Sequence, residues 1–245
     1  MSGHKEMRAI RVANHGGPEV LKIDPKVPVP VPSDTQVLVE VKAAGVNPVD
    51  TYIRSGTFRI TVPLPYTPGS DVAGIVSKVG AKVTKFKPGD KVYVIRNVSG
   101  GYAEFTVAEE TMVGKLPTHL SFSQGAGLGV PCYSASRAYI KAKDKVKPGN
   151  TVLVHGASGA VVGSRGTAEI VPRVIMYKEI IVTGFALWNA PPEEWVEMHQ
   201  VISEGLTKGW LVPSVQKEYK LEEASLAHEE IINNSGTTGN RILIM

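Results

Sequence analysis

The segment from Thr151 to Ala160 has the residue pattern of a nucleotide-binding turn. Its first five residues, TVLVH, form a short apolar run, and the glycine-rich sequence GASGA follows directly. A buried strand that enters a glycine-rich turn allows backbone N–H groups to come close to a pyrophosphate. The segment therefore predicts the start of a dinucleotide-binding unit.

The residues after this turn depart from the usual pattern. A helix of about a dozen residues should begin at the turn, because its N-terminus holds the anion and its body crosses to the next parallel strand. Instead, residues 161–167, VVGSRGT, predict a second short strand and a second glycine-rich turn. Two such units cannot be neighbours in a parallel sheet without a crossover. The alternative interpretation is that one of them is only a glycine loop.

Metal chemistry is not indicated by the residue types. The single cysteine, Cys132, has no second thiolate with which to bind zinc or form an internal disulfide. The six histidines, at positions 4, 15, 119, 155, 199 and 228, lack ligand spacing. We interpret each of them as a surface or packing residue and expect no metal.

The elements that would position these residues show two different residue patterns along the chain. Up to about Lys115, short β-branched runs separated by Gly, Pro and Asp predict an all-β unit with strands at 8–12, 37–43, 72–79, 91–95 and 102–107. Within it, Asn47 to Ser55 predicts a short helix, and Pro28, Pro30 and Pro32 predict an extended connector.

From about Leu120 the chain is expected to alternate helices and strands. We predict helices at 134–143, 193–206 and 221–233, and strands at 151–155, 180–187 and 242–245. The run at 151–155 is continuously apolar, as in a strand buried on both faces of a parallel sheet. The fold class expected from these two residue patterns is α/β.

Composition predicts an ordinary globular protein. The chain has 245 residues, 42% of them hydrophobic and 20% charged, with a net charge of +4 that is scattered rather than clustered. Nothing in this distribution demands nucleic acid. The N-terminus has no apolar segment of the signal-peptide kind, and residues 121–136 are too short to cross a bilayer. We expect a cytoplasmic protein with no membrane association.

Four further motifs resemble segments of a known family. They are NHGGPEVL at 14–21, AGVNPVDTYIRSG at 44–56, PYTPGSDVAG at 65–74 and GTTGNRILI at 236–244. Together with VHGASG at 154–159, they are similar to the zinc-free, zeta-crystallin-like quinone reductases of the medium-chain dehydrogenase/reductase superfamily. The resemblance covers residues 7–158 and 161–245.

This resemblance implies a two-domain architecture. Residues 1–120, completed by 210–245, would form a GroES-like β-barrel domain, and residues 121–209 would form a truncated Rossmann-type domain with a doubly wound parallel sheet. In the family, several βαβ crossovers separate the two glycine-rich turns, so roughly 80 residues are expected to be missing near Gly159 or Ala160.

The resemblance also implies NADPH as cofactor and reduction of quinones or related conjugated carbonyls. Tyr52 would lie beside the nicotinamide and donate a hydrogen bond to the reduced oxygen of the substrate. The alternative is that Tyr52 packs with Ile53 on an amphipathic helix. Asn47 would position the nicotinamide amide, or alternatively cap the short helix.

The remaining cofactor contacts are carried over from the family. Ser158, Gly159 and Ala160 would contact the pyrophosphate, and Gly163, Ser164 and Arg165 would contribute from the second turn. Phe185, Ala186 and Leu187 would flank the nicotinamide. The zinc positions of related enzymes correspond to 44–47 and 69–71, which contain no nitrogen or sulfur ligand.

The resemblance leaves a second function open. The truncated chain would then be an inactive binding or crystallin-like protein, with AU-rich RNA as a possible partner. Relatives also form homo-oligomers, which predicts one here if the chain folds.

Overall fold

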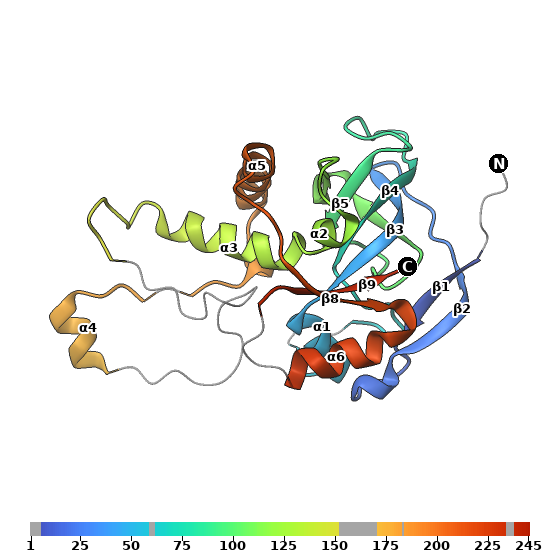
Figure 1. The fold of residues 1–245 in the computed structure, drawn as a ribbon, viewed down its shortest axis with the longest axis horizontal. Helices are drawn as coiled ribbons and strands as arrows, with labels where there is room; N and C mark the ends of the chain where they lie inside the picture. Colours follow the sequence, from blue (N-terminus) through green and yellow to red (C-terminus); the bar gives the residue numbers. More distant parts are fainter. Residues whose placement is uncertain (1–5, 59–61, 152–170, 183, 234–237) are drawn as a thin grey trace.

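The computed structural model describes residues 6–58, 62–151, 171–182, 184–233 and 238–245. A mixed seven-stranded sheet dominates one end of the molecule (Figure 1). Its strands follow the order β7-β5-β4-β3-β9-β8, and β6 pairs with β3. The bounds are β3 (Gln36–Val46), β4 (Asp71–Val79), β5 (Lys91–Ile95), β6 (Phe105–Glu109), β7 (Val113–Lys115), β8 (Val215–Lys220) and β9 (Asn240–Ile244).

Strand β3 lies at the centre of this sheet. It pairs antiparallel with β4, β6 and β9, so the C-terminal strand is built into the N-terminal sheet. Valine and alanine fill β3. Val39 and Val41 lie in one apolar core, and a register shift between Val41 and Ala43 turns Ala43 toward the other. The five strands predicted up to residue 107 and the final strand are confirmed, although β6 begins three residues later than expected.

The last two strands form a parallel pair. Strand β8 is parallel to β9, and the connection between them contains a 3-10 turn, Leu221–Glu223, and helix α6 (Ala224–Asn233). This connection is the helical crossover that a parallel pair requires. The predicted helix at 221–233 is therefore confirmed as the crossover element, whereas β8 has no counterpart in the prediction.

A separate two-stranded sheet pairs β1 (Glu6–Arg11) with β2 (Lys22–Pro28). The residues of β2 include Pro25 and end at Pro28. Proline cannot donate to a strand ladder and is tolerated at edges and ends. The proline-rich connector therefore begins only after a strand that the sequence pattern did not indicate.

Two apolar cores lie on opposite faces of the large sheet. The first packs α6 against the sheet through Ala224 and Ala227. The second packs α3 (Gly129–Ala142) and α5 (Pro192–Lys208) against it, with α2 (Phe122–Ala126) beside them. Helix α4 (Pro172–Lys178) lies away from the sheet (Figure 1). The predicted helix at 193–206 is confirmed as α5, and the one at 134–143 as α3.

The strand predicted at 180–187 is wrong where the structure describes it. Residues 180–182 and 184–186 have no regular secondary structure, and Leu187–Asn189 form a 3-10 turn. Ile181 and Val182 are exposed. A strand needs a neighbour for its N–H and C=O groups, and the part of the chain that the structure describes provides none here. The strand predicted at 151–155 lies, apart from Thr151, outside the described residues.

Candidate active site

Helix α1 (Pro48–Ser55) carries two of the predicted site residues and begins directly after Asn47. The Asn47 N–H donates to Asp50 Oδ2 over 2.8 Å, and the Asp50 N–H donates to the Asn47 carbonyl over 3.0 Å. The helix ends at Gly56, whose φ of 75° suits glycine. Asn47 is only 4% exposed. It therefore starts the helix, as one of the two interpretations predicts, and its contact with a cofactor stays a prediction.

The side chain of Asn47 is also tied to Asp71 at the start of β4. Its Nδ2 donates to Asp71 Oδ2 over 2.8 Å. The same oxygen accepts the N–H of Val130 over 2.6 Å, in the first turn of α3. A carboxyl group at this point satisfies one of the N–H groups that a helix start leaves without an intrahelical partner. Asp71 therefore connects the starts of α1 and α3.

Asp71 lies in an environment that opposes its charge. The residue is fully buried, and its Oδ1 atom has no hydrogen-bond partner. Burial raises the pKa of Asp71 to about 8, although the bonds from Val130 and Asn47 act in the opposite direction. The carboxyl group is therefore protonated at neutral pH.

A chain of buried polar groups continues from Asp50. Tyr102 OH donates to Asp50 Oδ2 over 3.2 Å and lies 3.1 Å from His228 Nε2, and His228 Nδ1 lies 3.3 Å from Arg54 Nη1. Because a guanidinium can only donate, His228 Nδ1 must accept and Nε2 must carry the hydrogen. Burial lowers the pKa of His228 to about 3, consistent with this neutral form. His228 is therefore a buried member of this polar network.

Tyr52 occupies the middle of α1 and is partly buried. Neither Tyr52 nor Ile53 belongs to the apolar clusters of the described residues. The alternative role of Tyr52, packing with Ile53, therefore gains no support from the cores. Its predicted hydrogen bond to a substrate stays a prediction.

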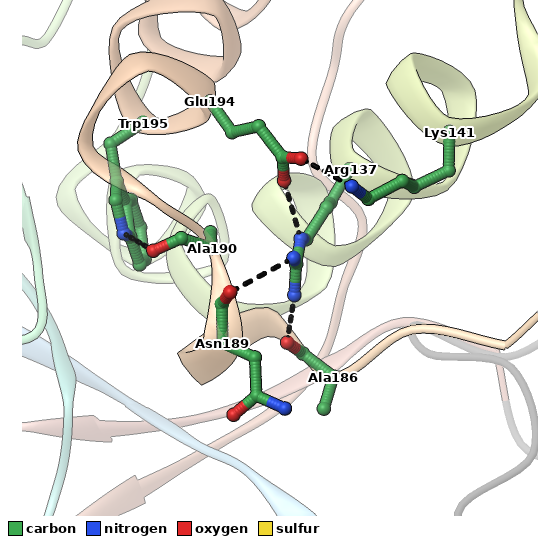
Figure 2. A network of polar contacts seen from close by, with 7 residues as sticks. All are labelled: Arg137, Lys141, Ala186, Asn189, Ala190, Glu194 and Trp195. Carbon is green, nitrogen blue, oxygen red and sulfur yellow. Dashed lines mark hydrogen bonds and ion pairs between the residues drawn. The ribbon is translucent and has the colours of Figure 1, made fainter.

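The segment predicted to flank the nicotinamide is held by one arginine. Figure 2 shows Arg137 of α3 pointing at the chain around Ala186 and Asn189. Its Nη1 donates to the Ala186 carbonyl, its Nη2 to the Asn189 carbonyl over 3.1 Å, and its Nε to Glu194 over 2.7 Å. Phe185 and Ala186 are exposed, whereas the Leu187 side chain is buried in the second core. A bound nucleotide could therefore contact the side chains of Phe185 and Ala186 but only the backbone of Leu187.

Helix α3 anchors two parts of the predicted site, Asn47 and the segment around Ala186. Val130 holds Asp71 and, through it, Asn47, whereas Arg137 holds Ala186 seven residues later. This separation corresponds to roughly 10 Å along a helix axis. The Asn47 and Ala186 ends of the predicted nicotinamide site are therefore anchored on the same helix.

A cavity of about 800 Å³ lies along another face of α3, between it, α5 and the residues that lead into β9. Cys132, Ser136 and Tyr139 line it from α3, and Trp210 and Leu211 line it from the chain after α5. Its lining is mostly apolar. None of the described residues predicted to bind the cofactor lines this cavity.

Several predicted contacts cannot be placed. Ser158, Gly159, Ala160, Gly163, Ser164 and Arg165 all lie outside the described residues. Within the ranges that the structure describes, no group of three or more His, Cys, Asp or Glu side chains could hold a metal ion. Over the same ranges, none of the helices combines the length and the apolar character needed to cross a membrane.

Sequence reasoning missed the residues that organise this site. Asp50 and Asp71 occur within the recognised motifs, yet nothing in the sequence shows that they are buried, or that Asp50 bonds to Tyr102 and Asp71 to Asn47. The one available signal was Asp71 inside the apolar run DVAGIV, where a charged residue requires partners. Arg137 gave no signal, because its acceptors lie 49 to 57 residues away in sequence.

Comparison with known proteins identifies relatives of this chain. Residues 33–118 match the alcohol dehydrogenase GroES-like domain. A human quinone oxidoreductase is 38% identical over 328 positions, which cover 100% of this chain and 99% of the relative. An Arabidopsis thaliana chloroplastic NADPH-dependent alkenal/one oxidoreductase is 39% identical over 168 residues, covering 64% of this chain and 42% of the relative.

A solved structure supports the fold. Escherichia coli quinone oxidoreductase, complexed with NADPH, superposes with a TM-score of 0.78 at 23% identity, covering 97% of this chain and 100% of that chain. The alignment with the human relative has 328 positions, more than the 245 residues of this chain, so it contains gaps on this side. The predicted α/β class with a GroES-like domain and a Rossmann-type part is confirmed. By its identity to full-length relatives, the chain belongs to the quinone oxidoreductase family of the medium-chain dehydrogenase/reductase superfamily.

Proposed function

We propose that this protein is an NADPH-dependent oxidoreductase that reduces quinones or related conjugated carbonyls. The observation that carries the proposal is the identity of 38% to a human quinone oxidoreductase across the whole chain. The Escherichia coli protein of the same fold was solved with NADPH bound, which supports the choice of cofactor. The described residues fit the nicotinamide half of this nucleotide, because Asn47 and the exposed Phe185–Ala186 stretch are anchored on one helix.

When bound, NADPH supplies the electrons for reduction at its nicotinamide. In the proposed mechanism the protein binds the nucleotide and the substrate, orients them toward each other and excludes water from the site. Phe185 offers an apolar surface for a planar ring, and Asn47 offers a side-chain amide at the start of α1. The Tyr52 hydroxyl donates a hydrogen bond to the substrate oxygen as negative charge develops there. Ser158, Gly159 and Ala160 would hold the diphosphate, together with Gly163, Ser164 and Arg165.

The proposed domain division follows the family pattern. Residues 1–120 and 210–245 form the GroES-like domain, and residues 121–209 form a shortened nucleotide-binding domain. The pairing of β9 with β3 supports assigning the C-terminus to the first domain. The gaps in the alignment with the human relative support a missing segment, which we place near Gly159 or Ala160.

Three finer statements rest on the resemblance alone. We propose a cytoplasmic location, a homo-oligomeric state and the absence of a bound zinc ion. No observation on this chain favours AU-rich RNA as a partner, since the relatives named above carry oxidoreductase names. A gel-shift with AU-rich RNA at physiological salt is the direct test of that alternative.

The first test is an NADPH titration of the purified chain, followed by nucleotide fluorescence and by melting temperature. Saturable binding with a rising melting temperature is the expected result, because a ligand that binds only the folded state stabilises it. NADPH oxidation with an ortho-quinone as acceptor is the second assay. The absence of both binding and turnover above background would refute the proposed function.

The role of Tyr52 is tested by Tyr52→Phe. Removing a hydrogen-bond donor to a developing oxyanion is expected to lower kcat about 100-fold, while the NADPH dissociation constant and the melting temperature stay close to the wild-type values. Tyr177→Phe is the matched control, because Tyr177 is 76% exposed on α4. Equal kcat values for both variants and the wild type would show that Tyr52 has no catalytic role.

A further inference from the structure

Arg137 is a buried cation on helix α3. It is 5% exposed, and each of its three guanidinium nitrogens donates to an acceptor on the chain between Ala186 and Glu194 (Figure 2). A planar guanidinium can satisfy several acceptors in fixed directions, which the ammonium group of lysine cannot do. The geometry of this stretch is therefore matched to arginine in particular.

The charge of Arg137 is balanced within the same cluster. Glu194, in the first turn of α5, accepts from Arg137 through Oε2 and from Lys141 through Oε1. These bonds lower the pKa of Glu194, so its carboxylate stays ionised. A buried guanidinium requires such a partner, because an unpaired buried charge is strongly unfavourable. Glu194 thus helps to hold the Arg137 guanidinium directed at the two carbonyl groups.

The stretch that Arg137 holds has further anchors after Leu187, where Trp188 packs against Trp195 and the Ala190 carbonyl accepts from Trp195 Nε1 over 3.2 Å. Residues 184–186 are exposed and form no helix or strand. After them, Leu187 is buried, the Asn189 N–H donates to the Ala186 carbonyl over 2.9 Å, and the Ala190 N–H donates to the Leu187 carbonyl over 3.0 Å. Both carbonyl groups at the ends of this turn, those of Ala186 and Asn189, accept from Arg137. Releasing them would loosen the chain before Leu187, because residues 184–186 form no helix or strand.

We propose that Arg137 is a positioning residue that fixes the Phe185–Ala190 turn and thereby sets the affinity for the nicotinamide end of NADPH. Arg137 does not itself touch the cofactor, and it acts through the carbonyl groups of Ala186 and Asn189. The link to NADPH rests on the proposed function, whereas the fixing of the turn does not. A residue that only holds a wall of the binding site should change KM for NADPH more than kcat.

Arg137→Lys tests this proposal by keeping the charge and removing the planar fork. Hydrogen exchange of the Asn189 and Ala190 amides, followed by mass spectrometry, is expected to accelerate at least about tenfold, because one or two charge-assisted hydrogen bonds are lost. KM for NADPH is expected to rise by a similar factor with little change in kcat. Glu194→Gln, which keeps an acceptor oxygen and removes the charge, should give smaller changes in the same direction.

Lys143→Met is the matched control. Lys143 pairs with Glu197 and so joins α3 to α5 as Arg137 does, but its pair is exposed and does not touch the turn. Unchanged exchange of the Asn189 and Ala190 amides in both Arg137→Lys and Glu194→Gln would overturn the proposal, as would equal acceleration in Lys143→Met. If the wild-type chain fails to bind NADPH, the proposed function fails, and the exchange rates alone decide whether Arg137 fixes the turn.

Discussion

Replacing Asp71 with asparagine should make the protein more stable, and increasingly so as the pH rises. The pKa of Asp71 is raised from 3.8 to about 8 by burial. Between these values the folded chain holds a proton that the unfolded chain has released. The free energy of unfolding therefore falls as the pH rises through this window. Asparagine is neutral throughout, and its carbonyl oxygen can accept from both Asn47 and Val130.

The magnitude follows from the width of the window. Each pH unit between the two pKa values contributes about 1.4 kcal/mol, so the stability of the variant relative to the wild type should increase by about 2.7 kcal/mol between pH 5 and pH 7. Urea unfolding at both pH values, with a common m-value, measures this change directly. Asp50, whose pKa is raised to about 7, also makes both proteins less stable as the pH rises, and after burial its charge is one of the causes that raise the pKa of Asp71.

Asp144→Asn is the control for this measurement, since Asp144 is exposed beyond the end of α3. The reasoning would be refuted if Asp71→Asn were less stable than the wild type by the same amount at both pH values. That result would mean that Asp71 is an ionised carboxylate whose hydrogen bonds to Asn47 and Val130 outweigh its burial.

Three further changes probe the same buried network. Tyr102→Phe removes the bonds to Asp50 and His228 and should cost about 1–3 kcal/mol in urea unfolding at pH 7; an unchanged midpoint would contradict this. His228→Gln should remove one acid-sensitive contribution: the pKa of His228 falls from 6.5 to about 3 on folding, so the stability of the wild type relative to the variant should fall by about 2.7 kcal/mol over two pH units below 6.5, and a difference that does not change with pH would refute the assignment. Gly129→Ala would place a Cβ atom 2.2 Å from the Asp71 carboxyl carbon and should cost about 1–3 kcal/mol by thermal unfolding, whereas wild-type stability would show that the carboxyl group moves freely.

Local patterns predicted most of the regular elements because their causes are local. Alternating valines specified β3 and β4, Asn47-Pro48 and Gly56 bracketed α1, and the two prolines before Glu193 marked the start of α5. The prediction for α3 began five residues late. The Val130 N–H is satisfied by Asp71, a residue 59 positions earlier, and no local signal reports such a bond.

The strand predicted at 180–187 shows the opposite error. The β-branched residues from Ile180 to Val182 have the composition of a buried strand. Strand formation depends on a partner ladder, and composition does not reveal whether one is present. The exposure of Ile181 and Val182 is the consequence in the part of the chain that the structure describes.

Motifs and side-chain periodicity are properties of short segments, so the amino-acid sequence was enough to identify the family, the all-β character of the first hundred residues and the residue types available for chemistry. How these segments are joined depends on the folded chain: β9 pairs with β3, Asp71 links Asn47 to α3, and Arg137 holds the Ala186 turn. Burial and long-range hydrogen bonding arise when distant segments pack together. Those two effects fix the ionisation state of Asp71 and orient the predicted nicotinamide site.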